Sequence, residues 1–381
     1  MKKSWWRKQA ELDDAQQRVI DLPVDGRYLL TGPPGSGKTN LLLLRAMFLS
    51  GSGLKDVIFL TVGRTLKEFI ATGVGEKGLV GAEQIFTYRS WVMRHLGEHA
   101  PRFMKTKPTG SYEETRPLYS AELDRVSKAM PALYDAILID EVQDLSAQEL
   151  ISLARLSPRL MIAGDARQQI FGGGEGLEAS SSLGLTHIAL RYHYRIGRQI
   201  CEAADSVFPP LDGVEPLIQT CNYNEKEFAS SRQLHRAANL DAQIDIALKE
   251  IQVQLQAFPG DTIGIFVPTN AYIEKVRDRL SRSSVGSLIG FHEAGLGATR
   301  EFDENKQIFV MTIHSAKGTE FRAVHLLGAE ALRGNTGSRK VVFTAFTRAK
   351  TSLSVSYSGT VKGFIASAFA LPATPKIGEL F

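Results

Sequence analysis

Short apolar runs alternate with longer amphipathic stretches through the first half of the chain. The runs predict five strands, at Arg27–Thr31, Asp56–Val62, Asp135–Ile139, Arg159–Ala163 and Thr186–Leu190. The stretches between them predict helices, among them Lys38–Ser50, Arg64–Ala71 and Ser146–Leu156. Continuous apolar strands that alternate with helices are typical of parallel sheets buried on both faces, so the pattern indicates the α/β fold class.

The same alternation returns in the second half. Strands are predicted at Thr262–Val267, Gln307–Ile313, Arg322–Leu327 and Ser352–Tyr357, and helices at Asp241–Ala257 and Thr269–Ser281. Between the halves, Phe208–Pro216 reads FPPLDGVEP, which predicts a loop. We therefore expect two domains, 1–190 and 191–381. The polar stretch Pro101–Pro117 predicts an exposed insertion in the first domain, within a small insertion of about 92–133, and the Gly/Ser-rich stretch Ser281–Gly297 predicts a loop or small insertion in the second.

Composition narrows the class of protein. The 381 residues are 43% hydrophobic and 23% charged, which is typical of a globular protein and excludes a chain that is disordered as a whole. No apolar run approaches the roughly 20 residues that cross a bilayer, so we expect no membrane partner. The N-terminus lacks a secretory h-region and only two cysteines occur, which favours a reducing, cytoplasmic location. A net charge of +4 permits nucleic-acid binding without arguing for it.

The most specific motif is GPPGSGKT at 32–39, a full match to the phosphate-binding pattern GxxxxGK[ST]. It follows a predicted strand and opens a predicted helix, whose N-terminal dipole favours anions. Lys38 would place its charge on the β- and γ-phosphates of ATP, and Thr39 would offer a hydroxyl to Mg²⁺. The other expected ATP-binding residues of the loop are Gly32, Gly35, Ser36 and Gly37.

A second motif, AILIDEVQD, ends a predicted strand with two acids, Asp140 and Glu141. Alone, such a pair is as readily a helix start, with Asp as the N-cap. After a phosphate-binding loop it favours a magnesium site at Asp140 and a water-activating role for Glu141.

Seven motifs, in the expected order, resemble those of superfamily 1 helicases of the UvrD/PcrA/Rep type, and the resemblance spans Leu12 to Tyr357. They are LDDAQQ, GPPGSGKT, DEVQD, AGDARQQIF, LRYHYR, VMTIHSAKGTEF and FTAFTRAK. The resemblance implies two tandem RecA-like P-loop domains with parallel sheets and an ATP site in the interdomain cleft. It implies that Gln16 reads adenine, Gln168 senses the γ-phosphate, Tyr194 stacks on the base and Glu320 contacts the nucleotide. Arg195 and Arg348 would stabilise charge on the γ-phosphate from the second domain.

The resemblance also implies a grip on single-stranded DNA. The positions that match strand-contacting motifs are Thr61, Arg64, Tyr88, Arg89, Phe171, Asn270, Thr312 and His314. Tyr88 would stack on a base, although a core aromatic is the alternative, and His314 has a structural alternative of its own. Two positions depart from the family pattern, since Val62 and Gly173 stand where relatives carry stacking aromatics. Both intervals that hold large accessory insertions in relatives are short here.

These features lead to two hypotheses. The first is an ATP-dependent single-stranded DNA translocase and helicase, 3′ to 5′ by resemblance, with RNA left open as a substrate. The second is an ATP-gated regulatory subunit of a nuclease, replication or defence complex, with little unwinding of its own. The N-terminal SWWRKQ segment would suit docking to such a partner, or is a ragged terminus. A small-molecule kinase explains the loop and the acid pair but leaves TIHSAKG and TRAK unexplained.

Overall fold

The computed structural model describes residues 12–61, 81–169, 174–210, 212–292 and 305–370. These form two compact units: the described residues up to Arg195 together with Ser315–Thr319, and the remaining residues from Ile196 onward. Residues 191–195, expected in the second domain, cluster with the first unit. The reason is local pairing, because the Leu190 amide donates to the Thr31 carbonyl at 2.8 Å and the Tyr194 amide to the Gly35 carbonyl at 3.4 Å.

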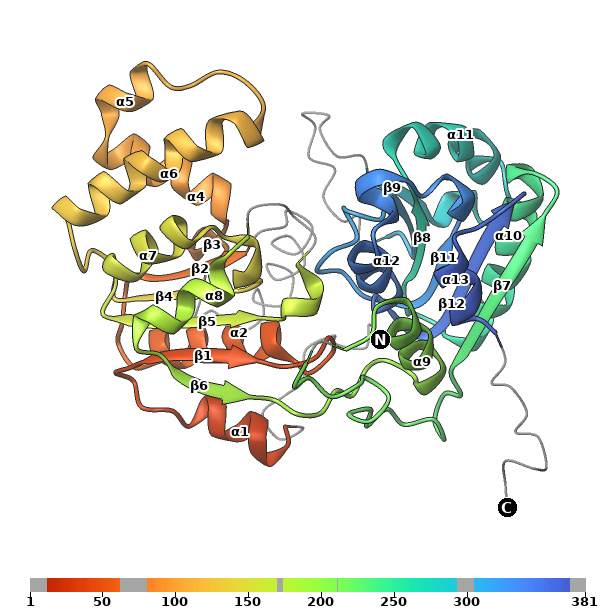
Figure 1. Ribbon diagram of the computed structural model, residues 1–381, viewed down its shortest axis with the longest axis horizontal. Helices are drawn as coiled ribbons and strands as arrows, with labels where there is room; N and C mark the ends of the chain where they lie inside the picture. Colours follow the sequence, from red (N-terminus) through yellow and green to blue (C-terminus); the bar gives the residue numbers. More distant parts are fainter. Residues whose placement is uncertain (1–11, 62–80, 170–173, 211, 293–304, 371–381) are drawn as a thin grey trace. The chain divides into compact units, whose positions relative to one another are not determined.

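Within the described residues, the first unit contains a six-stranded sheet in the order β3-β2-β4-β5-β1-β6 (Figure 1). Its paired strands are all parallel. The strands are β1 (Arg27–Thr31), β2 (Val57–Thr61), β3 (Ile85–Thr87), β4 (Ala136–Ile139), β5 (Arg159–Gly164) and β6 (Thr186–Ala189). Because β4, β5 and β1 are neighbours, the segments that follow these three strands start side by side at one edge.

Helices cover both faces of this sheet (Figure 1). They are α1 (Asp14–Ile20), α2 (Lys38–Gly51), α4 (Tyr88–His99), α5 (Pro101–Lys105), α6 (Tyr112–Ala129), α7 (Ala147–Arg155) and α8 (Gly176–Ser180). The side chains of β4 alternate between the two cores: Leu138 packs with residues of α1 and α2, whereas Ile137 and Ile139 pack with residues of α4, α6 and α7. This alternation requires apolar residues at every position of the strand.

Arg45 lies inside the core of the first unit, although it interrupts the apolar run of α2. It is 1% exposed, and its guanidinium donates to the carbonyls of Ile20, Leu22 and Pro23, which follow or end α1. A buried guanidinium is tolerated when its donors are satisfied in this way. These bonds tie the C-terminal half of α2 to the end of α1.

The second unit also contains a six-stranded parallel sheet within the described residues, in the order β7-β12-β11-β8-β10-β9. The strands are β7 (Ser231–Ala237), β8 (Ile263–Val267), β9 (Ile289–His292), β10 (Ile308–Thr312), β11 (Phe321–Leu326) and β12 (Ala349–Ser358). The helices are α9 (Arg198–Val207), α10 (Leu240–Ala257), α11 (Asn270–Ser281), α12 (Arg339–Phe346) and α13 (Gly363–Ala368). Both units are therefore parallel α/β sheets, and the predicted fold class is confirmed.

Most predicted elements appear within a few residues of their expected ends, but the described residues also contain three strands that the sequence did not predict, β3, β7 and β9. The insertion expected at Pro101–Pro117 holds α5 and the first turns of α6, which starts from a capping box of Ser111 and Glu114. Ser281–Gly297 contributes the strand β9 before the described residues end at 292. The helix expected at Arg64–Ala71 lies outside the described residues. The domain boundaries and the position of the ATP site between domains stay predictions.

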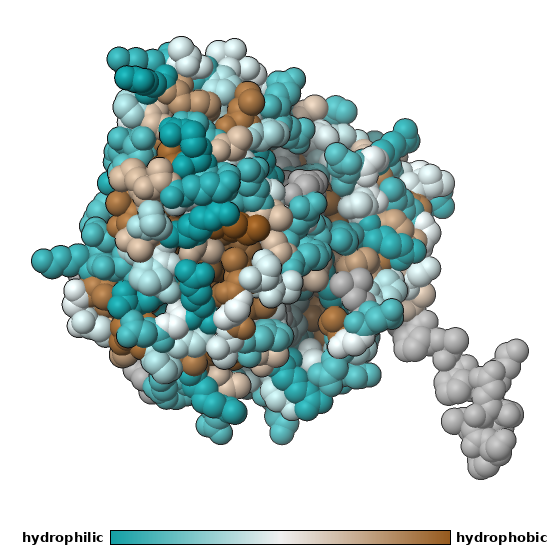
Figure 2. All heavy atoms as spheres, turned by 60° about the vertical axis from the view of Figure 1, so that its left-hand side comes forward, coloured by the Kyte–Doolittle hydropathy of each residue, from teal (hydrophilic) through white to brown (hydrophobic). Residues whose placement is uncertain are grey.

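The visible surface agrees with the composition. Figure 2 shows a mainly hydrophilic face with apolar groups interspersed among polar ones. The exposed large apolar side chains among the described residues come from separate elements and loops; they are Phe48, Leu118, Met130, Tyr192, Val214 and Val253. In the part of the chain that the structure describes, no helix has the length and apolar character needed to cross a bilayer.

Candidate functional site

The carboxyl edge of the first sheet gathers the sequence motifs in one place. The register aligns Thr31 with Gly164 and Ile139 with Ile162, so β1, β4 and β5 end almost level. The phosphate-binding loop follows β1, and Asp140 and Glu141 follow β4. Asp165 and Gln168 follow β5. Ligands of open α/β sheets bind at this edge, outside the carboxyl ends of the strands.

The loop at 32–37 has the geometry of an anion cradle. Gly37 is the N-cap residue of α2 with φ of 92°, and no side chain caps the helix. The orphan amide groups of the first turn are thus left for a bound anion. Gly32 is packed so closely that a Cβ would lie 2.9 Å from the Leu190 Cβ. The Ser36 hydroxyl is buried and has no hydrogen-bond partner among the described residues, which fits a phosphate oxygen as its missing partner.

Lys38 folds back onto the loop that precedes it. Its ammonium donates to the carbonyls of Gly32 at 2.8 Å and Pro33 at 3.1 Å. Burial lowers the pKa of Lys38, while the nearby carboxylates of Asp165, Glu141 and Asp140 oppose this effect and the Arg195 guanidinium adds to it. The site therefore brings a lysine, an arginine and three acids together. A triphosphate bound in the loop would be an anionic partner for both cations.

Asp140 and Thr39 form the pair expected to hold Mg²⁺. The Thr39 hydroxyl donates to Asp140 Oδ2 at 2.6 Å. Asp140 is 1% exposed, and burial, reinforced by the Glu141 carboxylate, raises its pKa to about 7. A buried carboxylate beside a second, partly exposed one favours a divalent cation, and carboxylate and hydroxyl oxygens are ligands that Mg²⁺ prefers. The residues present thus fit the ion, which would neutralise charge on the phosphates.

This raised pKa predicts that Asp140→Asn stabilises the metal-free protein. Between about pH 4 and pH 7 the folded chain holds a proton on Asp140 that the unfolded chain has released. The stability linked to this carboxyl is therefore present at low pH and lost as pH rises through the window. At pH 8, in EDTA, we expect the asparagine variant to unfold with a free energy about 1–3 kcal/mol higher than the parent, measured by urea titration. The gain should shrink towards pH 4.

The matched control is Asp212→Asn, at an exposed turn residue. It should change the free energy of unfolding by less than about 0.5 kcal/mol at both pH values. A loss of stability in Asp140→Asn at pH 8 would contradict the conclusion that burial raises the pKa of Asp140 in the folded protein.

Glu141 has an unusual backbone for a non-glycine residue. Its φ of 56° and ψ of 42° lie in the left-handed region. Such conformations cost of order 1 kcal/mol or more and cluster at functional sites. The Gln143 side chain donates to the Glu141 carboxylate and also accepts from the Asp165 amide at 3.1 Å, so it holds the acid in relation to the segment after β5. The orientation of the Glu141 carboxylate is therefore fixed by its own backbone conformation and by the side-chain amide of Gln143.

Two residues of the site received no role from the sequence. The Lys317 ammonium lies 2.5 Å from Asp144 Oδ2 and 3.7 Å from Glu141 Oε2, and it donates to the Gln168 carbonyl at 2.8 Å. Burial raises the pKa of Asp144 to about 6 against the opposing charge of Lys317. Both residues stand inside quoted motifs, DEVQD and TIHSAKG, and this position within a motif was the available signal.

Gln16 and Tyr194 lie beside the loop, as expected for residues near a bound nucleotide. Gln16 is 2% exposed; its Oε1 accepts from the Asp13 amide at 3.2 Å, and its Nε2 donates to the Ser36 carbonyl at 2.9 Å. The Tyr194 hydroxyl donates to the Asp13 carboxylate. Gln16 thus braces the loop in this arrangement, and its contact with adenine stays a prediction.

Gln168 and two residues of the second unit complete the predicted nucleotide contacts. Gln168 is buried, and its Nε2 donates to Asp165 Oδ2 at 2.8 Å. In the second unit, Arg348 is 6% exposed and its Nε donates to the Thr344 carbonyl at 3.0 Å. Glu320 Oε2 lies 3.6 Å from Lys350 Nζ.

The nucleic-acid candidates of the second unit lie along its carboxyl edge. Thr312 ends β10 and is paired in register with Val267, which ends β8. Asn270, the first residue of α11, follows three positions after Val267 and is exposed. Burial lowers the pKa of His314, which follows β10. These three candidates therefore share one edge, although their contact with a strand stays a prediction.

The candidates of the first unit differ in exposure. Thr61 is fully buried at the end of β2. Tyr88 is 5% exposed, and burial raises its pKa well above the ordinary value. This burial favours the core-aromatic alternative over base stacking. Arg89 is exposed, with its guanidinium 4.8 Å from the centre of the Tyr112 ring. Arg64 and Phe171 lie outside the described residues, as do Val62 and Gly173.

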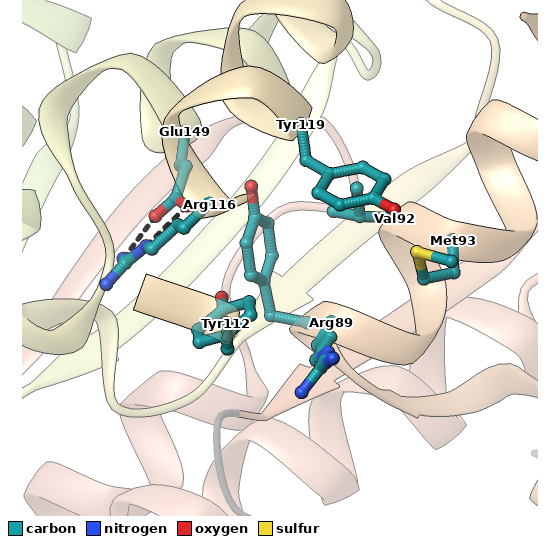
Figure 3. Close-up of a pocket in the computed structure, with 8 residues that line it drawn as sticks. Arg89, Val92, Met93, Tyr112, Arg116, Tyr119 and Glu149 are labelled. Carbon is teal, nitrogen blue, oxygen red and sulfur yellow. Dashed lines mark hydrogen bonds and ion pairs between the residues drawn. The ribbon is translucent and has the colours of Figure 1, made fainter. Parts of the chain in front are cut away.

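Tyr88 lies in a pocket between three helices of the first unit (Figure 3). Its lining comes from α4, α6 and α7 and consists of Tyr88, Arg89, Val92, Met93, Tyr112, Arg116, Tyr119 and Glu149. Arg116 and Glu149 pair at 2.5 Å, and the Glu149 side chain is fully buried. Arg116 also donates to the Asp144 carbonyl at 2.9 Å, which links the insertion helix α6 to the acid motif.

We expect Arg116→Ala to destabilise the protein, because it leaves the Glu149 carboxylate buried without its ionic partner. Breaking a buried pair from one side costs about 3–5 kcal/mol, and urea unfolding would measure it. The matched control is Arg125→Ala on the same helix, where the arginine side chain is 62% exposed and pairs with Glu122. That change should cost less than about 1 kcal/mol. Equal losses in the two variants would contradict the prediction.

Comparison with known families agrees with this site. The model of the UvrD-like helicase C-terminal domain matches residues 307–356, and that of an AAA domain matches residues 16–174. Together the two matches cover more than half of the chain, in the order that the motifs predict. The second half of the chain thus carries a UvrD-like helicase C-terminal domain. The AAA match spans the phosphate-binding loop, Asp140, Glu141 and Gln168, and the other match spans Glu320 and Arg348.

Among solved structures, one described as "The structure of PRRSV helicase" is similar, with 13% sequence identity and a TM-score of 0.42. The similarity covers 90% of this chain and 54% of that chain, so the present chain spans about half its length. No curated protein matches the chain.

Proposed function

We propose that this UvrD-like protein is an ATP-dependent translocase on single-stranded DNA that moves 3′ to 5′ and has helicase activity. The observation that carries the proposal is the cluster at the carboxyl edge of the first sheet. There Lys38 lies among Asp140, Glu141 and Asp165 at the start of an uncapped helix. UvrD-like helicase domains provide the family context.

The proposed chemistry assigns one task to each side chain. Lys38 binds the β- and γ-phosphates, and Thr39 and Asp140 hold Mg²⁺. Glu141 accepts the proton of the attacking water, because its carboxylate is fixed by Gln143 and its strained backbone. Gln168, Arg195 and Arg348 meet the charge that develops on the transferred phosphoryl group. The contacts of Gln16, Tyr194 and Glu320 with the nucleotide belong to the same proposal.

The test is ATP turnover with and without nucleic acid. We expect single-stranded DNA to raise the rate sharply, double-stranded DNA to raise it less, and higher salt to weaken the effect because phosphate contacts release counterions. RNA serves as a third arm, since phosphate contacts alone do not distinguish the sugars. Turnover that stays flat across all three titrations would reject the proposal. Directionality is tested by displacement of streptavidin from the 3′ or the 5′ end of a biotinylated strand.

A second candidate is an ATP-gated regulatory subunit, and the burial of Tyr88 favours it. A tyrosine that is 5% exposed offers no stacking face in this arrangement, so one expected strand contact is missing. The insertion between β3 and β4 is also small, with three helices in the described residues. ATP turnover together with failure to displace streptavidin from either end would support this candidate over the first. Co-purification of a nuclease or replication factor whose activity follows ATP would identify the partner.

A further inference from the structure

The two cysteines of the chain lie together in the second unit, twenty positions apart in sequence. Cys201 is on α9 and fully buried, and Cys221 is partly exposed. Their sulfur atoms lie within 4.8 Å of each other. Both thiols donate to one acceptor, the Ile196 carbonyl, at 3.5 Å from Cys201 and 3.3 Å from Cys221. A chain with only two cysteines that folds them onto one carbonyl provides a local dithiol.

The two thiols differ in a way that suits stepwise oxidation. A hydrogen bond from Cys201 lowers the pKa of Cys221 to about 7, assisted by the Tyr223 backbone and the Arg198 guanidinium. Burial raises the pKa of Cys201. Cys221 is therefore the accessible thiolate, and Cys201 is the buried neighbour that remains a thiol.

We propose that Cys201 and Cys221 form a peroxide-sensitive dithiol that closes into a reversible disulfide. The Cys221 thiolate attacks one oxygen of hydrogen peroxide, the O–O bond breaks, and a sulfenic acid and hydroxide form. The Cys201 sulfur then attacks the Cys221 sulfur, and the S–O bond breaks. The Cys201 proton and the departing hydroxide leave as water. The hydroxide of the first step takes up the proton that Cys221 had released, so in total two thiols are oxidised, one peroxide is reduced, and two waters form.

The position of the dithiol connects it to the arginines of the proposed ATP site. Ile196 directly follows Arg195, and the Gly197 amide donates to the Lys350 carbonyl at 2.8 Å, two residues beyond Arg348. A disulfide has no S–H group, so oxidation leaves the Ile196 carbonyl without the thiol donors of the reduced, protonated pair. It also ties α9 to residue 221. We therefore expect the disulfide to lower ATP turnover, an effect that rests on the proposed function.

The experiment treats the full-length protein, first freed of metals with EDTA, with hydrogen peroxide and then with N-ethylmaleimide under denaturing conditions. Intact mass should show two maleimides on the reduced protein. The oxidised protein should carry none and should have lost two hydrogen atoms, and dithiothreitol should reverse both changes. In Cys201→Ser, the Cys221 sulfenic acid should persist and be trapped by dimedone. In Cys221→Ser, peroxide should leave Cys201 open to alkylation.

Two outcomes would overturn the dithiol: sulfinic acid on Cys221 with Cys201 still alkylated, or a disulfide only between two chains on a non-reducing gel. ATP turnover is measured on the same samples, with Cys201→Ser and Cys221→Ser as peroxide-treated controls. Loss of most turnover in the oxidised parent, restored by dithiothreitol, supports regulation, whereas unchanged turnover despite the disulfide overturns that part. If the reduced protein shows no turnover at all, the proposed function fails while the mass readout still decides the dithiol.

Discussion

Replacing Lys38 with alanine is expected to abolish ATP turnover, with a loss of at least about 10²–10³-fold. The ammonium is the cation closest to the phosphate cradle, and it already occupies the loop through the carbonyls of Gly32 and Pro33. Without it, the carboxylates of Asp140, Glu141 and Asp165 would face the phosphates with less positive charge to offset them. Turnover is measured by phosphate release, and binding by a fluorescent ATP analogue. We expect both to fall.

The matched control is Lys55→Ala, because Lys55 is an exposed lysine just before β2 in the same unit. Its turnover should stay within about twofold of the parent, since surface substitutions of this kind change stability by only about ±0.5 kcal/mol. Circular dichroism of both variants would show that the fold is kept. If Lys38→Ala retained turnover within tenfold of the parent, the nucleotide would have to bind elsewhere.

Replacing Glu141 with glutamine is expected to separate binding from hydrolysis. The amide keeps the shape of the side chain but cannot accept a proton, and general base catalysis typically contributes about 10²–10⁴-fold. ATP affinity should be kept or improved, because one carboxylate near the phosphates is removed. The loss of this charge should also lower the pKa of Asp140, which Glu141 helps to raise. A single-turnover assay with pre-bound ATP measures the chemical step directly.

Glu178→Gln provides the control, since Glu178 is an exposed acid on α8 of the same unit. It should leave both binding and single-turnover rate unchanged. A Glu141→Gln variant that hydrolysed ATP at the parental rate would assign the proton to another group, and Asp144 would be the next acid to examine because it lies in the same motif. A variant that lost ATP binding as well would instead indicate a structural role for the left-handed residue.

The fold could be predicted from sequence wherever strands are apolar throughout. The buried runs at β4 and β8 have no polar position, and β10 has one only at its last residue, so these three strands could be predicted. The edge strand β7 was missed because its sequence, SRQLHRA, is mostly polar. Its strand conformation is stabilised by pairing with β12 along seven residues, which the hydrophobic pattern does not reveal. The helix α6 was partly misread because Pro117 lies inside it, after a capping box that had already started the helix.

The nucleotide site could be predicted further than the nucleic-acid site. A phosphate-binding loop has fixed spacing because backbone amides form it, so Lys38 and Thr39 are found from sequence alone. Asp140 follows because parallel strands end at one edge. Strand contacts depend instead on whether a side chain is exposed, which the motif around Tyr88 does not encode. The pair of Lys317 and Asp144 was also missed, because residues 173 positions apart meet only through the tertiary fold.

The buried guanidinium of Arg45 has a mechanical consequence. It fastens one end of α2 to the stretch that leaves α1, while Gln16 fastens α1 to the carbonyl of Ser36 near the other end of α2. Because hydrogen bonds join the two helices near both ends of α2, we expect α1 and α2 to move as one rigid body. If a bound triphosphate displaces the phosphate-binding loop, we therefore expect Gln16, the residue predicted to lie near the adenine base, to move together with that loop.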